Sequence, residues 1–245
     1  MESTYNTQAI ILKKTPKGEN DLEIDLYSPD YGRMFLGARG ALRKGAKLAG
    51  HLEPITLGDF MIIRGKGSDY IGSALGENFY LNIKEDLEKI KYASLALRSL
   101  DRYTRLKDPL PLSFFDDFRR YLDILNKEKG EGKYDLFYIS FLLKFASALG
   151  FSPDFYKCVN CSKNLRGREK GEKIVFDIAG GGVLCPDCSS GKTNEKNRLL
   201  FSVSGLKLSR FLAGEDFYRI KRLKVSSSVF KEAFNLVNYF YKYHL

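Results

Sequence analysis

Five short segments in the first 80 residues have the apolar patterning of β-strands. In one of them Leu22, Ile24 and Leu26 alternate with Glu23, Asp25 and Tyr27, which is typical of a half-buried strand. Turns containing glycine separate several of the segments, which lie at residues 7–14, 22–27, 33–38, 54–64 and 70–76. Short strands at this density predict a small closed barrel, and an OB-fold is the natural candidate.

The pattern changes near residue 81, where apolar positions begin to recur at the spacing of a helix. A first helix is expected from Ile83 to Leu100, before the prolines at 109 and 111. Four more are expected, rich in aromatic side chains that should fill a core, at about residues 114–125, 137–149, 204–212 and 229–243. We therefore predict an α+β multidomain chain, with an N-terminal barrel at 1–80 and an all-helical domain at 81–245.

Four cysteines stand in two C-x-x-C pairs, Cys158 with Cys161 and Cys185 with Cys188, with 23 residues between the pairs. Each pair brings two thiolates toward one point, and four sulfur ligands suit tetrahedral Zn²⁺ with no open coordination position. We predict one structural zinc ion per chain, in a ribbon inserted in the helical domain at about residues 156–190. A redox role is disfavoured, because the chain lacks the βαβ context and one redox motif leaves the second pair unexplained.

The formal net charge is +10 and the estimated pI is 9.3, which favours an anionic partner. Residues 31–52 hold five basic side chains and no acidic one, although residues 1–80 as a whole are neutral. Nucleic-acid contact is favoured here over the alternative of a solvated loop. The predicted DNA-binding residues are Arg33, Arg39, Arg43, Lys44 and Lys47, supported by Lys13, Lys14 and Lys66.

Two further features keep more than one interpretation. A second basic cluster, Arg219, Lys221, Arg222 and Lys224, can extend a DNA path, receive an acidic partner tail, or form a solvated surface. Tyr31 and Phe35 could stack on bases in the manner of an OB-fold. For Phe35, packing inside the barrel is the favoured expectation.

The sequence offers few side chains in patterns typical of catalytic sites, so we predict no catalytic residue and no enzyme. The only histidines are His51 and His244, and the sequence contains no G-x-S-x-G, H-E-x-x-H or carboxylate-rich metal motif. The chain opens with polar residues rather than a signal peptide, and no window approaches the roughly 20 apolar residues of a membrane span. We expect a cytoplasmic, nucleoid-associated protein that does not contact membranes.

Five sequence elements follow one another along the chain: Lys14-Thr15 with Glu19-Asn20-Asp21, the turn at 27–32, Gly37-Ala38-Arg39-Gly40-Ala41 with Arg43-Lys44, residues 48–54, and Gly150-Phe151-Ser152-Pro153 before the first cysteine pair. In this order they resemble the RecO family of recombination mediators over nearly the whole chain. Two departures are notable: Leu42 stands where a basic residue is expected, which removes one possible phosphate contact, and Glu53 replaces a glutamine beside the basic stretch.

The resemblance implies more than the residues show. It implies an N-terminal OB-fold, a C-terminal helical domain, binding of single- and double-stranded DNA, and annealing of complementary strands. It also implies partnership with RecR, contact with the C-terminal tail of the single-strand binding protein, and help in loading RecA. Whether RecF takes part is left open.

Two rival classes are weighed against a mediator. A zinc-ribbon and OB-fold module acting on RNA or in transcription would also be basic and bind polyanions; strand annealing separates the two. A hydrolase or nuclease is disfavoured, because acidic and basic residues at sensible catalytic spacings are missing.

Overall fold

The computed structural model describes residues 3–129, 133–166, 173–190 and 197–245. The chain divides into two compact units, Met1–Lys129 and Gly130–Leu245. The change from strands to helices falls between residues 78 and 81, but the first compact unit continues to Lys129. A domain boundary near residue 80 therefore stays a prediction.

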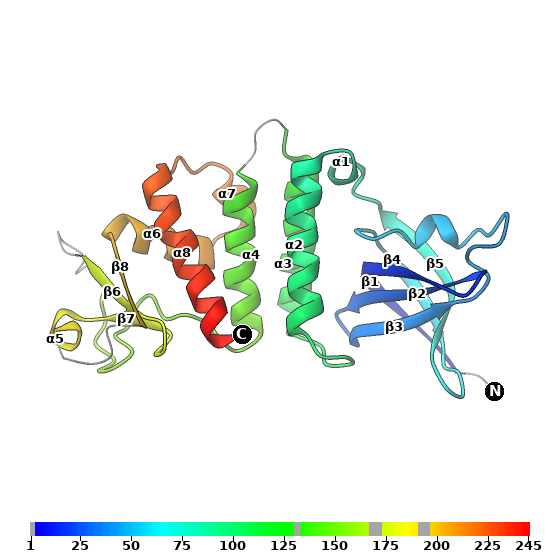
Figure 1. The fold of residues 1–245 in the computed structure, drawn as a ribbon, viewed down its shortest axis with the longest axis horizontal. Coiled ribbons are helices and arrows are strands. Elements are labelled where there is room, and N and C mark those ends of the chain that lie inside the picture. Colours follow the sequence, from blue (N-terminus) through cyan, green and yellow to red (C-terminus); the bar gives the residue numbers. More distant parts are fainter. Residues whose placement is uncertain (1–2, 130–132, 167–172, 191–196) are drawn as a thin grey trace. The chain divides into compact units, whose positions relative to one another are not determined.

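The first unit contains a closed five-stranded barrel (Figure 1), and the five predicted strands are confirmed. The strands close in the order β1-β2-β3-β5-β4, and β3 meets β5 in a parallel pairing of Gly37 with Tyr70. A register irregularity between Ile11 and Lys13 divides β1, so that its first half pairs with β4 and its second half with β2. The strands are β1 (Thr4–Lys17), β2 (Asp21–Ser28), β3 (Gly32–Ala38), β4 (Leu57–Ile63) and β5 (Tyr70–Asn78).

Alternation along the strands decides which side chains fill the barrel. On β3, Met34, Leu36 and Ala38 point inward and are almost fully buried. The loop after β3 contributes Ala41, 1% exposed, and the loop before β4 contributes Leu52 to the same core. The connection between β3 and β4 therefore packs against the barrel core through these two residues.

Three helices complete the first unit: α1 (Leu81–Lys84), α2 (Leu87–Tyr103) and α3 (Leu112–Lys127). One helix was expected where α1 and α2 lie. The Asp86 side chain accepts hydrogen bonds from the backbone N–H groups of Glu88 and Lys89, so it caps a new helix instead of continuing the old one. The aromatic face of α3 is buried as predicted, with Phe114 and Phe118 at most 2% exposed.

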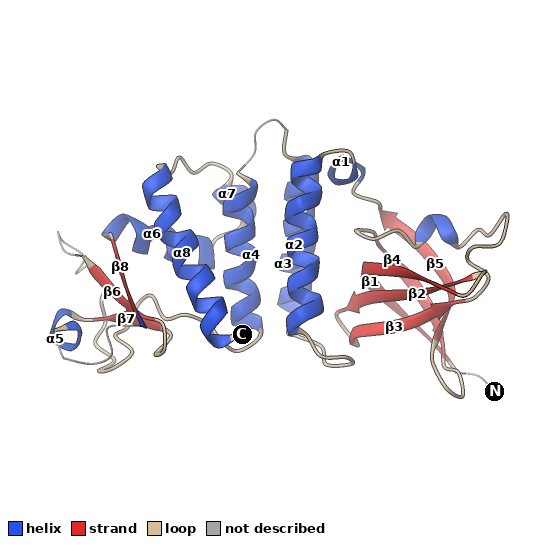
Figure 2. Cartoon of the chain, in the orientation of Figure 1, coloured by secondary structure: helices blue, strands red, loops and turns tan. Residues whose placement is uncertain are grey.

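The second unit combines four helices with a small ribbon (Figure 2). The three longest helices pack against one another, and the ribbon strands form a sheet in the order β7-β6-β8. The helices are α4 (Tyr134–Ala148), α6 (Val203–Gly214), α7 (Phe217–Ile220) and α8 (Ser227–His244). The ribbon consists of β6 (Ile174–Asp177), β7 (Gly182–Leu184), the one-turn helix α5 (Pro186–Ser189) and β8 (Arg198–Phe201).

The ribbon is fastened to the last helix. The Phe176 ring lies 6.4 Å from the Phe240 ring, and Nε2 of His244 lies 2.6 Å from the carbonyl oxygen of Ile178. The predicted hairpin around residues 180–182 is confirmed, whereas β8 and α7 were not expected. Residues 167–172 of the predicted insertion lie outside the described residues. Within the described ranges, no helix combines the length and apolar character that crossing a bilayer requires.

Candidate metal centre and candidate nucleic-acid surface

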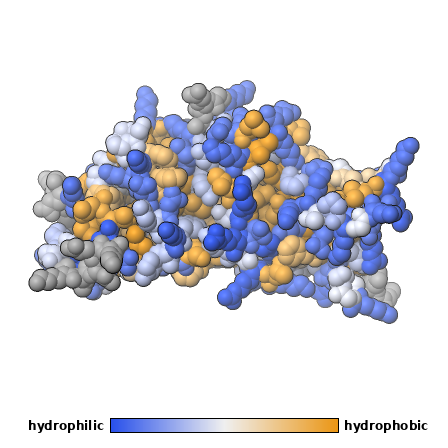
Figure 3. Space-filling view, viewed as in Figure 1, coloured by the Kyte–Doolittle hydropathy of each residue, from blue (hydrophilic) through white to orange (hydrophobic). Residues whose placement is uncertain are grey.

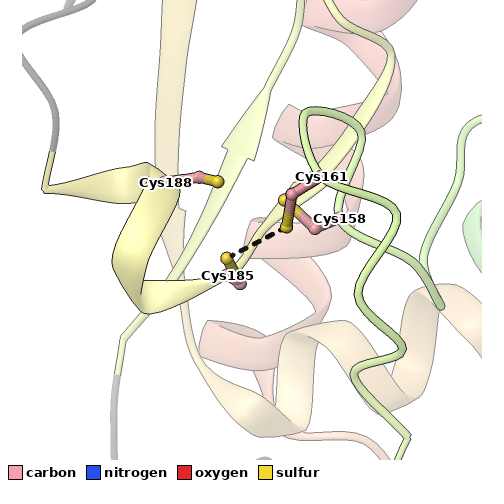
Figure 4. A group of neighbouring side chains, drawn as sticks. All are labelled: Cys158, Cys161, Cys185 and Cys188. Carbon is pink, nitrogen blue, oxygen red and sulfur yellow. Dashed lines mark hydrogen bonds between the residues drawn. The ribbon is translucent and has the colours of Figure 1, made fainter.

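Two tight backbone turns bring the four cysteines together (Figure 4). In the first turn the N–H of Ser162 donates to the carbonyl of Cys158 at 2.8 Å, with Ser162 in the left-handed region at φ 58°. In the second turn Cys185 caps α5, and the N–H of Cys188 donates to the carbonyl of Cys185 at 3.1 Å. The N–H of Val159 donates to the carbonyl of Val183, which fixes one turn against the other.

The spacing of the sulfur atoms fits one tetrahedral ion. All four Sγ atoms lie within 4.8 Å of one another, and those of Cys161 and Cys185 are 3.6 Å apart. Zinc–sulfur bonds of about 2.3 Å in a tetrahedron place sulfur atoms roughly 3.8 Å apart. Cys158 and Cys185 are buried and Cys161 is exposed, so the cluster lies at the surface of the ribbon with its inner half covered.

The electrostatics of the cluster also favour a cation. Burial opposes ionisation of Cys158, but backbone N–H groups, led by that of Cys185, lower the pKa of its thiol to about 6. At Cys188 the amide of Asn160 favours the thiolate, but the neighbouring sulfurs, led by Cys185, outweigh it and raise the pKa to about 12. Four thiolates cannot form side by side without a positive ion, so the residues present fit a divalent metal.

Two polar contacts surround the sulfur atoms. Nδ2 of Asn160 donates to Sγ of Cys188 at 3.3 Å, and thus joins the first turn to the second. Nζ of Lys163 pairs with Asp187 at 3.0 Å, and this exposed ion pair also joins the first turn to the second. Such contacts orient metal ligands and reduce the charge on a thiolate. The sequence offered no clear signal for either contact, because the partners lie 28 and 24 residues apart.

Four of the predicted DNA-binding residues lie together on the loop after β3. The loop is pinned by two hydrogen bonds, from the Gly40 N–H to Asp21 at 2.7 Å and from the Leu42 N–H to the Asn20 carbonyl at 2.9 Å. Gly40 adopts φ +64°, a conformation that favours glycine. The loop therefore projects its cations from a fixed backbone. We call this set the loop cations, all of them exposed: Arg39, Arg43, Lys44 and Lys47.

The expectation for Arg33 is corrected by the structure. Arg33 is 8% exposed, and its guanidinium binds Asp25 through contacts of 3.0 Å from Nε and 2.7 Å from Nη2. It also donates to the side chain and the carbonyl oxygen of Asp101 on α2. Its charge is satisfied inside the protein, so Arg33 fastens α2 to the barrel and is not available to a phosphate.

The three supporting lysines lie on two segments of the barrel. Lys13 is exposed on β1, and Lys66 is exposed on the connection between β4 and β5. Lys14 is also exposed, but its Nζ pairs with Glu53 at 2.5 Å, so part of its charge is neutralised by the acid that departs from the family pattern.

Two aromatic residues of this surface differ from expectation or were missed. Phe35 was expected inside the barrel, but it is 45% exposed on the outer face of β3. The alternation that places Met34 and Leu36 inside already assigns Phe35 to the outside, so the signal was present. Nothing in the sequence predicted that Tyr70 belongs to this surface. In the structure the Arg39 guanidinium lies 4.2 Å from the centre of the Tyr70 ring. Tyr31 is half-buried and packs on Tyr5, with 4.6 Å between ring centres.

The second basic cluster lies in the second unit, at α7 and the connection to α8, and all four side chains are exposed. Arg219 pairs with Glu215 at 2.7 Å, and Lys133 donates to the carbonyl oxygens of Lys221 and Leu223. Lys224 borders an open groove of about 410 Å³ between α6 and this connection, lined also by Lys207, Leu208, Phe211, Leu223, Val225 and Val229. Figure 3 shows one face of the molecule, on which hydrophilic side chains project from both units.

Comparisons with known proteins match nearly the whole chain to one family. The family model for the N-terminal part of recombination protein O matches residues 1–78, and the model for its C-terminal part matches residues 84–245. A DNA repair protein RecO from Dehalococcoides mccartyi strain CBDB1 is 27% identical over 228 residues, covering 93% of this chain and 85% of the relative. One from Desulforamulus reducens is 26% identical over 241 residues, covering 98% and 90%. One from Rubrobacter xylanophilus is 31% identical over 194 residues, covering 76% and 72%.

The two family models together match the chain from its barrel to its last helix, across the cysteine cluster and both basic regions. The chain belongs to the RecO family.

Proposed function

We propose that this protein is a non-enzymatic mediator of recombinational DNA repair. In this role it binds single- and double-stranded DNA, anneals complementary strands and, with RecR, helps to load RecA onto DNA coated by single-strand binding protein. The relatives carry the name DNA repair protein RecO, which supports the role in repair. The observation that carries the DNA contact is the group of four loop cations on a pinned backbone.

The barrel supports this function by its connectivity. We interpret the strand order β1-β2-β3-β5-β4, closed by β1 against β4, as an OB-fold. Such barrels bind oligonucleotides on the face of the second and third strands and on the loops between strands 1 and 2 and between strands 4 and 5. Lys66 lies on the connection between β4 and β5, and the loop cations follow directly after β3.

The physical basis of annealing is charge neutralisation without base recognition. Two DNA strands repel each other through their phosphates, and cations that release counterions from both strands reduce this cost. Contacts to phosphate carry no sequence information and leave base edges free to pair. Cations on long side chains and a fixed loop suit this task, and no bond of the DNA needs to be broken.

We propose further that Cys158, Cys161, Cys185 and Cys188 hold one structural Zn²⁺. The donor set, the sulfur spacing and the mutual opposition of the thiols to ionisation support this assignment. Four sulfur ligands leave no open position for a substrate, so the ion would stabilise the ribbon rather than perform chemistry. Metal analysis of the purified protein should give one equivalent of zinc, and replacing Cys185 by Ser should remove it.

A groove in the second unit has the chemistry that would suit the partner tail. The groove is lined by Lys207 and Lys224, by apolar side chains that include Phe211 and Val229, and by two serines. An acidic peptide with apolar side chains matches such a groove in both charge and polarity. We propose that the C-terminal tail of single-strand binding protein binds here, in a protein that is cytoplasmic and associated with the nucleoid. RecR is a further proposed partner, and whether RecF takes part is left open.

The test is annealing of two complementary labelled strands, first bare and then coated with single-strand binding protein, at low and moderate salt. Acceleration on both substrates supports a mediator. Tight binding to DNA without acceleration would contradict the proposal and favour an RNA-binding or transcription-associated module. A charge-reversed variant at Arg43 and Lys44 should lose acceleration while keeping the thermal stability of the wild type.

A further inference from the structure

The four sulfur atoms of the cysteine cluster differ in their access to solvent. Cys158 and Cys185 are buried and Cys188 is half-buried, whereas Cys161 is exposed. Cys188 also accepts a hydrogen bond from the side-chain amide of Asn160, which draws electron density away from its sulfur. A dissolved oxidant therefore reaches the sulfur of Cys161 first.

Binding of a divalent ion keeps these cysteines in the reactive form. A metal-bound cysteine is held as the thiolate, and the thiolate is the form of cysteine that reacts with peroxides. Among several thiolates, exposure decides which one is oxidised. Zinc itself has no redox chemistry, so the electrons for any such reaction come from sulfur.

A second sulfur lies close enough to react with an oxidised Cys161. Figure 4 shows the side chains of Cys161 and Cys185 meeting between the two turns, and their Sγ atoms are 3.6 Å apart. A disulfide bond is about 2 Å long, so an approach of roughly 1.5 Å joins the two sulfurs. Because the two residues belong to different turns, their disulfide holds the turns together in the way that a shared metal ion does.

We propose that Cys161 is a site of oxidative modification, at which hydrogen peroxide converts Cys161 and Cys185 into a disulfide that replaces the metal. This inference rests on the proposed zinc site and goes beyond it, because it gives the ribbon a second closed state that contains no metal.

The reaction takes two steps. In the first, the Cys161 thiolate attacks one oxygen of the peroxide; an S–O bond forms, the O–O bond breaks, and hydroxide leaves, so that Cys161 becomes a sulfenic acid. In the second, the Cys185 thiolate attacks this sulfur; the S–S bond forms, the S–O bond breaks, and a second hydroxide leaves. Two protons from solvent convert both hydroxides to water. The two sulfurs together lose two electrons, and the peroxide gains them.

Oxidation leaves Cys158 and Cys188 as the remaining thiols of the cluster. Two sulfur ligands do not make the four-coordinate site that structural zinc requires, so the ion is released. The two turns stay together, because the new disulfide joins them and the N–H of Val159 still donates to the carbonyl of Val183 at 3.0 Å. The oxidised ribbon is therefore closed, and reduction in the presence of zinc restores the original site.

The test uses the full-length, zinc-loaded protein. Hydrogen peroxide should release its zinc to a chromogenic chelator, with loss of two of the four thiols. After alkylation and digestion with trypsin without reduction, mass spectrometry should find peptides 158–163 and 174–192 joined, with fragment ions that place the bond between Cys161 and Cys185. The oxidised protein should melt at a higher temperature than protein stripped of zinc by a chelator and kept reduced.

Cys161→His and Cys188→His are a matched pair, because three cysteines and one histidine are an ordinary set of zinc ligands. Cys161→His should release zinc to peroxide at least about 10-fold more slowly than the wild type, since the exposed thiolate is gone. Cys188→His keeps both reacting sulfurs, so its release rate should stay within about 2-fold of the wild type and the same peptides should be joined.

Equal rates of zinc release in the two variants would overturn the assignment of Cys161. A disulfide confined to peptide 158–163 would overturn the bond between the turns, and this mapping of the wild type decides the question alone if either variant fails to bind zinc. Zinc-loaded protein that keeps its metal in peroxide would overturn only this inference. Protein purified without zinc would overturn the metal assignment together with it, and annealing of DNA by the wild type tests the proposed function separately.

Discussion

The salt dependence of DNA binding distinguishes the buried arginine from the exposed ones. For single strands, each phosphate contact contributes about −0.7 to the slope of log affinity against log salt concentration. Counting all five cations of residues 31–52 gives a slope of roughly −3.5. Arg33 is excluded from this count because its charge is bound by Asp25 and Asp101. The four loop cations that remain give a slope of roughly −2.8.

Two single substitutions then have opposite signatures. Arg43→Ala should reduce the steepness of the slope by about 0.7 and leave thermal stability within error, because its side chain is exposed. Arg33→Ala should leave the slope unchanged but destabilise the first unit by about 3–5 kcal/mol, because the carboxylate of Asp25 is 3% exposed and would lose its partner. The double variant Arg33→Met with Asp25→Leu should recover part of that loss.

The assay is fluorescence anisotropy of a labelled oligothymidylate between about 50 and 300 mM salt, at a temperature where circular dichroism shows every variant folded. The slope is the readout, because affinity by itself also reflects contacts that neutralise no phosphate. A shallower slope in Arg33→Ala would refute our assignment of a structural role. An unchanged slope in Arg43→Ala would refute the loop as the DNA contact.

Three further predictions concern the metal, the barrel and the partner groove. Asn160→Ala should speed zinc release to a chromogenic chelator, since Cys188 loses a hydrogen bond of 3.3 Å; Asn164→Ala is the control, and equal release rates would contradict the role. Gly32→Ala should lower the melting temperature more than Gly18→Ala: both glycines have positive φ, but a Cβ at Gly32 would meet backbone at 2.6 Å, whereas at Gly18 it meets nothing within 4 Å. Lys224→Glu should weaken binding of an acidic, apolar peptide at least about 5-fold and leave DNA annealing on bare strands unchanged, as calorimetry and the annealing assay can show.

Local pattern predicted the parts of this protein whose cause is local. The five strands follow from alternation and from glycine-containing turns, and the cysteine cluster follows from a two-residue spacing that allows a tight turn. The aromatic face of α3 likewise follows from helical period. Asp86 is a residue type typical of a helix N-cap, yet the apolar spacing predicted a single helix across it.

Tertiary structure decided which charged and aromatic side chains face solvent. Arg33 and Arg39 stand six residues apart in one basic stretch, yet Arg33 is buried because its partner Asp101 comes from a helix 68 residues away. Leu87 is apolar and yet 85% exposed at the start of α2. The residues of the sequence fix which groups can bind phosphate or bases. Packing of distant elements fixes which of them remain available, because the cost of leaving a charge unpaired in the interior depends on the whole fold.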